Sequence, residues 1–232
     1  MIDWHSHILP NMDDGSKSIK ESLCLLKMLA EQDVDIVVAT PHFYANDESV
    51  EEFLKRREAS CRALHGNLSE SAPKILLGAE VRYYPGISRL SGLKQLRIEN
   101  TNLLLLEMSM SKWSESIVSE LTELASRSDL TVILAHVERY LPLQSADAIE
   151  RLLESGILMQ VNASGFTEFG SRRKTLNLLN SGIVHFIGSD THNTVSRPPE
   201  IKKAFAIIQK KFGDSFINEM NEYGYSQLVQ NN

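Results

Sequence analysis

The chain opens with Met1-Ile2-Asp3-Trp4-His5-Ser6-His7, a short apolar run that ends in two histidines one residue apart. Near its other end, Val184-His185-Phe186-Ile187-Gly188-Ser189 leads in the same way to Asp190-Thr191-His192. Alternate residues of a strand point to the same face, so each pair can approach one metal ion from the end of its strand. Closure of a barrel places the first and last strands side by side. The two pairs therefore predict a closed barrel with a metal site shared by the two ends of the chain.

Between these ends, short apolar runs alternate with longer amphipathic segments. Continuous apolar runs such as Asp35-Ile36-Val37-Val38-Ala39 are typical of parallel strands that are covered on both faces. The predicted strands are 2–5, 36–40, 74–80, 102–107, 131–136, 158–162 and 184–190. The first predicted helix begins after Ser18. The other predicted helices span 49–65, 115–128, 146–155, 171–181 and 199–212, with a weaker one at 214–222.

Two of these helices begin with the sequence of a capping box, Ser18-Ile19-Lys20-Glu21 and Ser49-Val50-Glu51-Glu52. Seven βα units predict an α/β fold, a distorted TIM-like barrel of about seven parallel strands with surrounding helices. An open, doubly wound sheet is the alternative. We expect a single domain over residues 1–232, because no linker-like segment interrupts the chain.

Composition narrows the function classes. A formal charge of −6 disfavours a nucleic-acid backbone as the main partner, since that role needs a basic balance. The cysteines, Cys24 and Cys61, fit a reducing compartment without a disulfide framework. The N-terminus does not resemble a signal peptide, and no apolar run approaches the length of a membrane span. We therefore expect a cytoplasmic protein.

Side chains that bind metals stand at or just after the end of nearly every predicted strand, or in the loop that follows. In a β/α barrel these ends open onto the one face where such folds carry their chemistry. Asp13 has the weaker claim of its acidic pair and is expected to cap or orient its loop. His65, in a helix tail, and His185, inside a strand, are expected to be structural. The candidate ligands are His5, His7, Asp14, His42, Glu80, Glu107, His136, Asp190 and His192.

These ligands are too many for one tetrahedral zinc ion, so the sequence predicts two or three divalent ions. Mixed imidazole and carboxylate ligands suit Mn²⁺, Fe²⁺ or Zn²⁺ and do not choose among them. Closely spaced ions would activate a hydroxide for phosphoryl or carbonyl hydrolysis. Arg139 and Arg197 follow two of the ligands and favour phosphate, which a guanidinium binds bidentately. Exposed loop arginines or local ion pairs are the alternative for both.

At these residues the chain resembles the polymerase and histidinol phosphatase (PHP) family, and more closely its bacterial manganese-dependent protein tyrosine phosphatases of capsule and exopolysaccharide clusters. The most specific matches are Asp13-Asp14-Gly15, His136-Val137-Glu138-Arg139-Tyr140 and the stretch from Asp190 to Pro199. The resemblance implies a trinuclear site made by the nine candidate ligands, with Mn²⁺ the first choice of metal. It also implies that Arg139 and Arg197 bind phosphate while a metal-activated hydroxide attacks phosphorus directly. Thiolate chemistry is excluded independently, because the chain has no Cys-x5-Arg loop.

The resemblance implies a phosphotyrosine protein as substrate, namely the C-terminal tail of a membrane-associated tyrosine kinase that controls polysaccharide export. Three alternatives stay open. They are a small-molecule phosphoesterase like histidinol-phosphate phosphatase, an amidohydrolase, which the arginines disfavour, and a binding module, which the complete ligand set disfavours. An open, shallow mouth would favour a protein substrate, and an enclosed pocket a metabolite. The sequence leaves the oligomeric state, a monomer or a ring, open.

Overall fold

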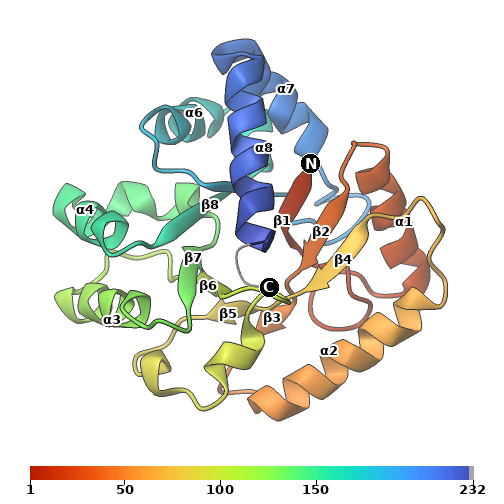
Figure 1. Ribbon diagram of the computed structural model, residues 1–232, viewed down its shortest axis with the longest axis horizontal. Helices are drawn as coiled ribbons and strands as arrows, with labels where there is room; N and C mark the ends of the chain where they lie inside the picture. The colour runs from red at the N-terminus through yellow and green to blue at the C-terminus, as the bar shows by residue number, and fades with distance from the viewer. Residues whose placement is uncertain (230–232) are drawn as a thin grey trace.

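Parallel strands form the centre of the structure, a computed structural model that describes residues 1–229 (Figure 1). Hydrogen bonds order the strands as β1-β2-β4 and as β3-β5-β6-β7-β8-β9, and every pair is parallel. The strands are β1 (Ile2–Ser6), β2 (Ile36–Ala39), β3 (His42–Phe43), β4 (Lys74–Leu77), β5 (Glu80–Arg82), β6 (Leu103–Glu107), β7 (Thr131–Leu134), β8 (Leu158–Asn162) and β9 (Phe186–Gly188).

The predicted strand 36–40 is confirmed by β2 and is followed, after a break, by the short strand β3, whereas the prediction of one continuous strand over 74–80 is wrong because β4 ends at Leu77 and β5 begins at Glu80. Pro41 lies between β2 and β3, where its missing N–H cannot join a strand ladder. The two broken strands stay side by side, because Gly78 N donates to Ala39 O at 2.8 Å and Glu80 N donates to Pro41 O at 3.0 Å. The strands of residues 1–229 therefore occupy seven positions around the barrel, as predicted.

The two ends of the chain complete the ring. Asp190 N donates to His5 O at 2.8 Å, and His7 N donates to Thr191 O at 2.9 Å. The backbones come so close that a Cβ at Gly188 would lie 2.5 Å from the Cβ of His5. β9 is shorter than the predicted strand 184–190. The predicted barrel is confirmed over the doubly wound alternative.

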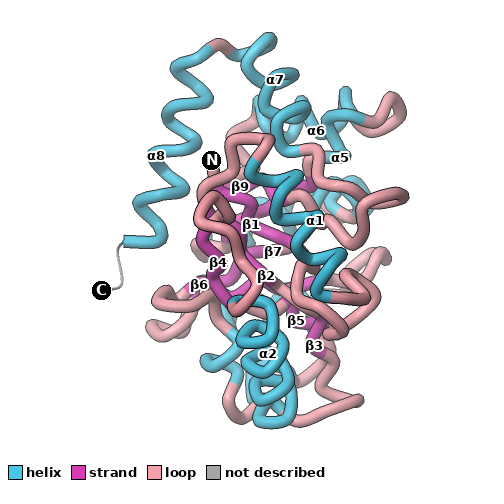
Figure 2. The backbone as a smooth tube through the Cα atoms, turned by 90° about the vertical axis from the view of Figure 1, so that its right-hand side faces the viewer, coloured by secondary structure: helices cyan, strands magenta, loops and turns pink. Residues whose placement is uncertain are grey.

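Helices surround the strands (Figures 1 and 2). The capping box is complete at Ser49 and Glu52, whereas Ser18 caps its helix but the Glu21 carboxylate accepts from Lys17 N instead. The helices are α1 (Ile19–Ala30), α2 (Val50–His65), α3 (Glu115–Ala125), α4 (Ala146–Glu154), α5 (Ser164–Thr167), α6 (Arg172–Asn180), α7 (Ile201–Phe212) and α8 (Asp214–Val229). Short 3₁₀ turns lie at Ile87–Arg89, Leu93–Leu96, Val137–Arg139 and Leu141–Leu143.

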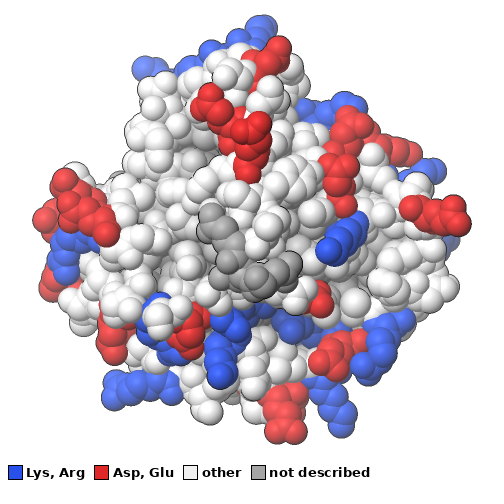
Figure 3. Space-filling model, viewed as in Figure 1, with Lys and Arg blue, Asp and Glu red and all other residues white. Residues whose placement is uncertain are grey.

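α8 is longer than the predicted helix 214–222 and lies across the amino-terminal ends of the strands (Figure 1). Gly224 packs on Trp4, and the Tyr223 ring stacks on Phe186 at 5.8 Å. Basic and acidic side chains are interspersed around the edge of this face (Figure 3). Over residues 1–229, no helix has both the length and the hydropathy to cross a bilayer. One end of the barrel is therefore apolar and covered, and the polar side chains gather at the other.

Candidate metal centre

All nine predicted ligands lie together at the carboxyl ends of the strands. His7 and His42 each belong to two groups of potential ligands, so the groups are contiguous. His136 joins them through Nε2, which lies 2.9 Å from Glu80 Oε1. Within each group the ligand atoms lie within 4.8 Å of one another, and the groups are His7, Asp14, His42 and His192; His5, His7 and Asp190; and His42, Glu80 and Glu107.

Glu80 stands at the middle of this cluster and is almost fully buried. Its Oε2 lies 2.9 Å from His42 Nδ1, 3.2 Å from His5 Nε2 and 3.3 Å from His7 Nε2. Burial alone would raise the pKa of Glu80, but His5, His136 and His42 hold that pKa well below its usual range. An ionised carboxylate in this position would help to hold divalent cations and offset their charge.

Backbone irregularities turn His5, His7 and His136 toward the cluster. Along β1, Ile2 and Trp4 face the barrel interior, and the register then shifts between Asp3 and Ser6. This bulge changes which side chains face inward, so His5 and His7 also reach the cluster. At the end of β7, His136 adopts a left-handed φ of 37° directly after the inward-facing Ala135.

Hydrogen bonds fix the rings of three histidines. His7 Nδ1 lies 2.7 Å from Asp13 Oδ2, and His192 Nδ1 lies 3.0 Å from the carbonyl oxygen of Asp190. His5 Nδ1 lies 3.3 Å from the side-chain oxygen of Gln160. When each Nδ1 donates its proton, Nε2 is left with a lone pair directed at the cluster.

The sequence suggested that Asp13 caps or orients its loop. In the structure it also contacts two candidate ligands. Besides facing His7, its Oδ2 accepts from His42 N at 2.9 Å, and its Oδ1 accepts from Gly15 N at 2.9 Å. Burial would raise the pKa of Asp13, but the His7 side chain and these N–H groups lower it. Asp13 is thus a charged anchor for two candidate ligands at once.

Sequence reasoning gave no role to two polar side chains of β8. Gln160 Oε1 accepts from His136 N at 2.8 Å, and Gln160 Nε2 donates to Asn162 Oδ1 at 3.0 Å. Asn162 Nδ2 in turn donates to Asp190 Oδ2 at 2.7 Å. Their signal in the sequence is two alternate polar residues in an otherwise apolar strand, which places both on the inward face.

The two predicted phosphate-binding arginines meet at one carboxylate. Arg139 Nη2 and Arg197 Nη2 each lie 2.7 Å from Asp190 Oδ2. The sequence left local ion pairs open as an alternative, and these pairs are present. Each contact uses one of the five N–H groups of a guanidinium, so both arginines keep donors for a ligand. A third arginine, Arg82, pairs with Glu107 at 2.8 Å and was not predicted.

Two cavities border the cluster. The arginine cavity has a volume of about 310 Å³ and is lined by Arg139, Ser164, Glu168, Ser189, Asp190, Ser196, Arg197, Pro198 and Glu200. The aspartate cavity has a volume of about 440 Å³ and is lined by Met12, Asp13, Asp14, His42, Tyr44, Asp47, Glu48 and Arg56. The cluster can therefore be approached through either cavity.

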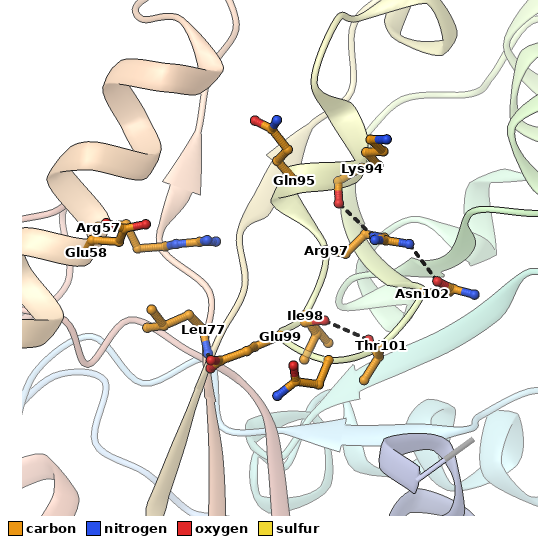
Figure 4. A pocket seen from close by; sticks show the side chains of 11 residues that line it. Arg57, Glu58, Leu77, Lys94, Gln95, Arg97, Ile98, Glu99, Thr101 and Asn102 are labelled. Atoms are coloured by element: carbon orange, nitrogen blue, oxygen red, sulfur yellow. Dashed lines mark hydrogen bonds between the residues drawn. The ribbon is translucent and has the colours of Figure 1, made fainter. Parts of the chain in front are cut away.

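A further cavity of about 440 Å³ contains no predicted ligand (Figure 4). It lies between α2 and the turn before β6, where Arg57 donates to the carbonyl of Gly78 at 2.6 Å. Arg57 thereby satisfies the backbone at the break between β4 and β5. His65 and His185 also lie away from the cluster, and His185 Nδ1 accepts from Met159 N at 3.1 Å.

The residues of the cluster fit divalent cations. Within the cluster, four buried side-chain nitrogen and oxygen atoms have no hydrogen-bond partner, and they are His42 Nδ1, Glu80 Oε2, His136 Nδ1 and His192 Nε2. Burial and the neighbouring His7 lower the pKa of His192 to about 4, so its ring is neutral near pH 7 and able to ligate. Facing lone pairs of this kind are costly unless a cation lies between them.

The family model for capsular polysaccharide synthesis, CpsB/CapC, matches residues 1–229. The chain belongs to the CpsB/CapC family. It is 30% identical over 248 residues to the tyrosine-protein phosphatase CpsB of Streptococcus agalactiae, covering all of this chain and 99% of that protein. It is 31% identical over 238 residues to CpsB of Streptococcus pneumoniae, and the match covers 95% of this chain and 94% of that protein. The predicted family is confirmed.

A solved structure supports the same fold. It comes from crystal structures of YwqE from Bacillus subtilis and CpsB from Streptococcus pneumoniae, described as metal-dependent tyrosine phosphatases. The TM-score is 0.83 at 22% identity, and the match covers all of this chain and 96% of the other. A histidinol phosphatase structure from Listeria monocytogenes matches less closely, with a TM-score of 0.53 at 14% identity over 85% and 98% of the two chains.

Proposed function

We propose that this chain is a metal-dependent tyrosine-protein phosphatase that acts in capsular polysaccharide synthesis. The observation that carries the proposal is that nine candidate ligands and two arginines converge on one face of the barrel. Membership of the CpsB/CapC family supports it, because the relatives just compared are tyrosine-protein phosphatases.

We assign the metal ions to His5, His7, Asp14, His42, Glu80, Glu107, His136, Asp190 and His192. Two or three divalent ions fit this set, and Mn²⁺ is the first choice because the chain resembles manganese-dependent phosphatases; the mixed imidazole and carboxylate ligands alone would also suit Fe²⁺ or Zn²⁺. Such ions supply Lewis-acid activation of water and neutralise charge on the phosphate oxygens.

The arginines bind and orient the phosphate. Their second N–H groups can reach phosphate oxygens while the first remain on Asp190, and a guanidinium fork holds two such oxygens in one plane. Asn162 helps to keep Asp190 in place by donating to the same oxygen. Phosphate would thus bind with its oxygens already oriented, which lowers the entropic cost of reaching the transition state.

The shape of the site favours a protein substrate over a metabolite. Asp14 is exposed, and the cluster opens on the arginine cavity and on the aspartate cavity. A small metabolite is better held by an enclosed pocket, which buries most of its surface. We therefore place histidinol phosphate second.

We propose further that residues 1–232 act as one PHP-type domain. The substrate we favour is the tyrosine-phosphorylated C-terminal tail of a membrane-associated kinase, and the place of action we favour is the cytoplasm. The motif resemblance supports the choice of substrate, and the two cysteines, which fit a reducing compartment, support the choice of the cytoplasm.

The test is hydrolysis of a phosphotyrosine peptide and of histidinol phosphate by metal-stripped protein after addition of Mn²⁺, Mg²⁺ or Zn²⁺. We expect Mn²⁺ to restore activity on the peptide. His136→Ala should abolish turnover with the fold retained, and Arg197→Ala should mainly raise KM. Preference for histidinol phosphate would move the protein to the small-molecule branch, and unchanged activity in both variants would overturn the site assignment.

A further inference from the structure

Large apolar side chains are exposed in a pattern. Within residues 1–229, the exposed ones that lie outside α8 all stand in the segments between the carboxyl end of a strand and the long helix that follows it. This is the face that carries the metal cluster. The side chains are Tyr44, Met110, Leu143, Phe169 and Val195.

Two of them are next in sequence to residues that line the arginine cavity. Phe169 is 99% exposed and Val195 is 87% exposed, and their neighbours Glu168 and Ser196 line that cavity. They come from different loops, one between β8 and α6 and the other between β9 and α7. The two side chains therefore stand on loops that share the rim of the place where Arg139 and Arg197 would hold phosphate.

Hydrogen bonds hold both loops in shape. Asn193 Oδ1 accepts from Val195 N at 3.0 Å and from Ser196 N at 2.7 Å, which fixes a turn with Val195 on the outside. Arg172 donates to the carbonyls of Phe166 at 2.7 Å and Thr167 at 2.8 Å, shortly before Phe169. Ordered backbone thus presents two apolar side chains to water.

Such an arrangement suits an aromatic phosphate ester on a polypeptide. In phosphotyrosine a benzene ring separates the phosphate from the backbone, so a phosphate bound by the arginines places that ring near the rim of the cavity. Apolar contacts around a buried polar anchor are a common design of binding sites, and exposed apolar groups beside a functional site indicate a binding surface.

We propose that Phe169 and Val195 form a docking surface for the polypeptide segment around the phosphotyrosine, and that they contact its ring and the apolar residues next to it. This inference rests on the proposed phosphatase activity. It makes the two side chains determinants of specificity, since they would favour phosphotyrosine over phosphoserine in the same peptide.

The test compares Phe169→Ala and Val195→Ala with Val229→Ala. Val229 is also exposed, at 69%, but lies on α8 at the other end of the barrel, so it is a matched control for Val195. With Mn²⁺ present, each rim variant should lower kcat/KM for a phosphotyrosine peptide about tenfold through KM, a loss expected from partial burial of one apolar side chain. The Val229→Ala variant should match the wild type.

Two further measurements sharpen the result. Activity on a phosphoserine peptide of the same sequence should change much less in the rim variants, so the ratio of the two substrates should fall. Binding of a labelled phosphotyrosine peptide, followed by fluorescence anisotropy in the His136→Ala background, should weaken by a similar factor without turnover.

Failure of this inference differs from failure of the proposed function. Wild-type protein that is inactive on every phosphotyrosine substrate would overturn the function, and the docking surface with it. Active wild type with rim variants equal to Val229→Ala would overturn the docking surface alone. A loss of oligomers in the rim variants, with unchanged peptide kinetics, would assign the surface to a second copy of the chain and also overturn it.

Discussion

Substitution of Asp13 by Asn should weaken metal binding although Asp13 is not itself one of the assigned ligands. The carboxylate accepts from Gly15 N and His42 N and faces His7 Nδ1 at 2.7 Å. An Asn side chain has one oxygen in place of two, so either Gly15 N or His42 N must lose its acceptor. If the amide nitrogen faces His7, the ring must take its proton on Nε2, which then cannot bind metal.

The expected magnitude follows from these contacts. Loss of a charge-assisted hydrogen bond costs about 1.5–3 kcal/mol. Removal of the partner that orients a metal-binding histidine typically lowers metal affinity ~10–100-fold. We therefore expect Mn²⁺ affinity to fall by about this factor at one of the sites, with much of the turnover recovered at high Mn²⁺ concentration.

The assay is calorimetric titration of metal-stripped protein with Mn²⁺, together with activity at increasing Mn²⁺. Asp47→Asn is the control, because Asp47 lines the same aspartate cavity and carries the same charge. Equal Mn²⁺ titration curves for Asp13→Asn and Asp47→Asn would refute the reasoning, since only general electrostatics would then be at work.

Two further predictions concern stability. Gly188→Ala should lower the free energy of unfolding, measured by urea denaturation, by ~1–3 kcal/mol, because the new Cβ would lie 2.5 Å from the Cβ of His5. Gly170→Ala is the control and should change this free energy little, because no atom lies near a Cβ at Gly170. Equal effects of the two substitutions would contradict the tight approach of β1 and β9. Burial lowers the pKa of His185, so the unfolded chain binds the extra proton first as pH falls below about 6.5. The contribution of His185 to the free energy of unfolding is therefore complete above about pH 6.5 and is lost as the pH falls below it. His185→Gln keeps an acceptor for Met159 N and should reduce the fall in urea stability over that pH range. An unchanged pH dependence would show that His185 does not titrate in this way.

The sequence predicted where the candidate ligands lie because strand alternation is a local property. In β6, Leu103, Leu105 and Glu107 share one face, and the first two line the apolar interior. Glu107 must then face the interior as well, at the end where the barrel opens. A local pattern of this kind needs no knowledge of the neighbouring strands.

The remaining features depend on tertiary contacts. The interruption around Gly78 is bridged by hydrogen bonds to a neighbouring strand that is itself interrupted at Pro41. Gln160 acts on residues of other strands, including His5 and His136, which lie far away in the chain. The ion pairs of the arginines with Asp190 likewise require the end of β9 to stand beside the 3₁₀ turn Val137–Arg139. None of these partners can be read from local sequence.

At some candidate ligands, strand alternation alone does not direct the side chain toward the cluster. There the backbone departs from regular strand conformation. β1 would present Ile2 and Trp4 but not His5 and His7 to the interior without its bulge. His136 follows an inward-facing alanine and reaches the cluster through a left-handed φ, and Asp190 also has a positive φ, 52°. Such conformations are unfavourable for residues other than glycine and persist only where the surroundings hold them. The Gln160 side chain on His136 N and the His5 carbonyl on Asp190 N provide that support. Unfavourable backbone conformations at the carboxyl end of the barrel thus turn candidate ligands inward, while α8 covers the apolar end.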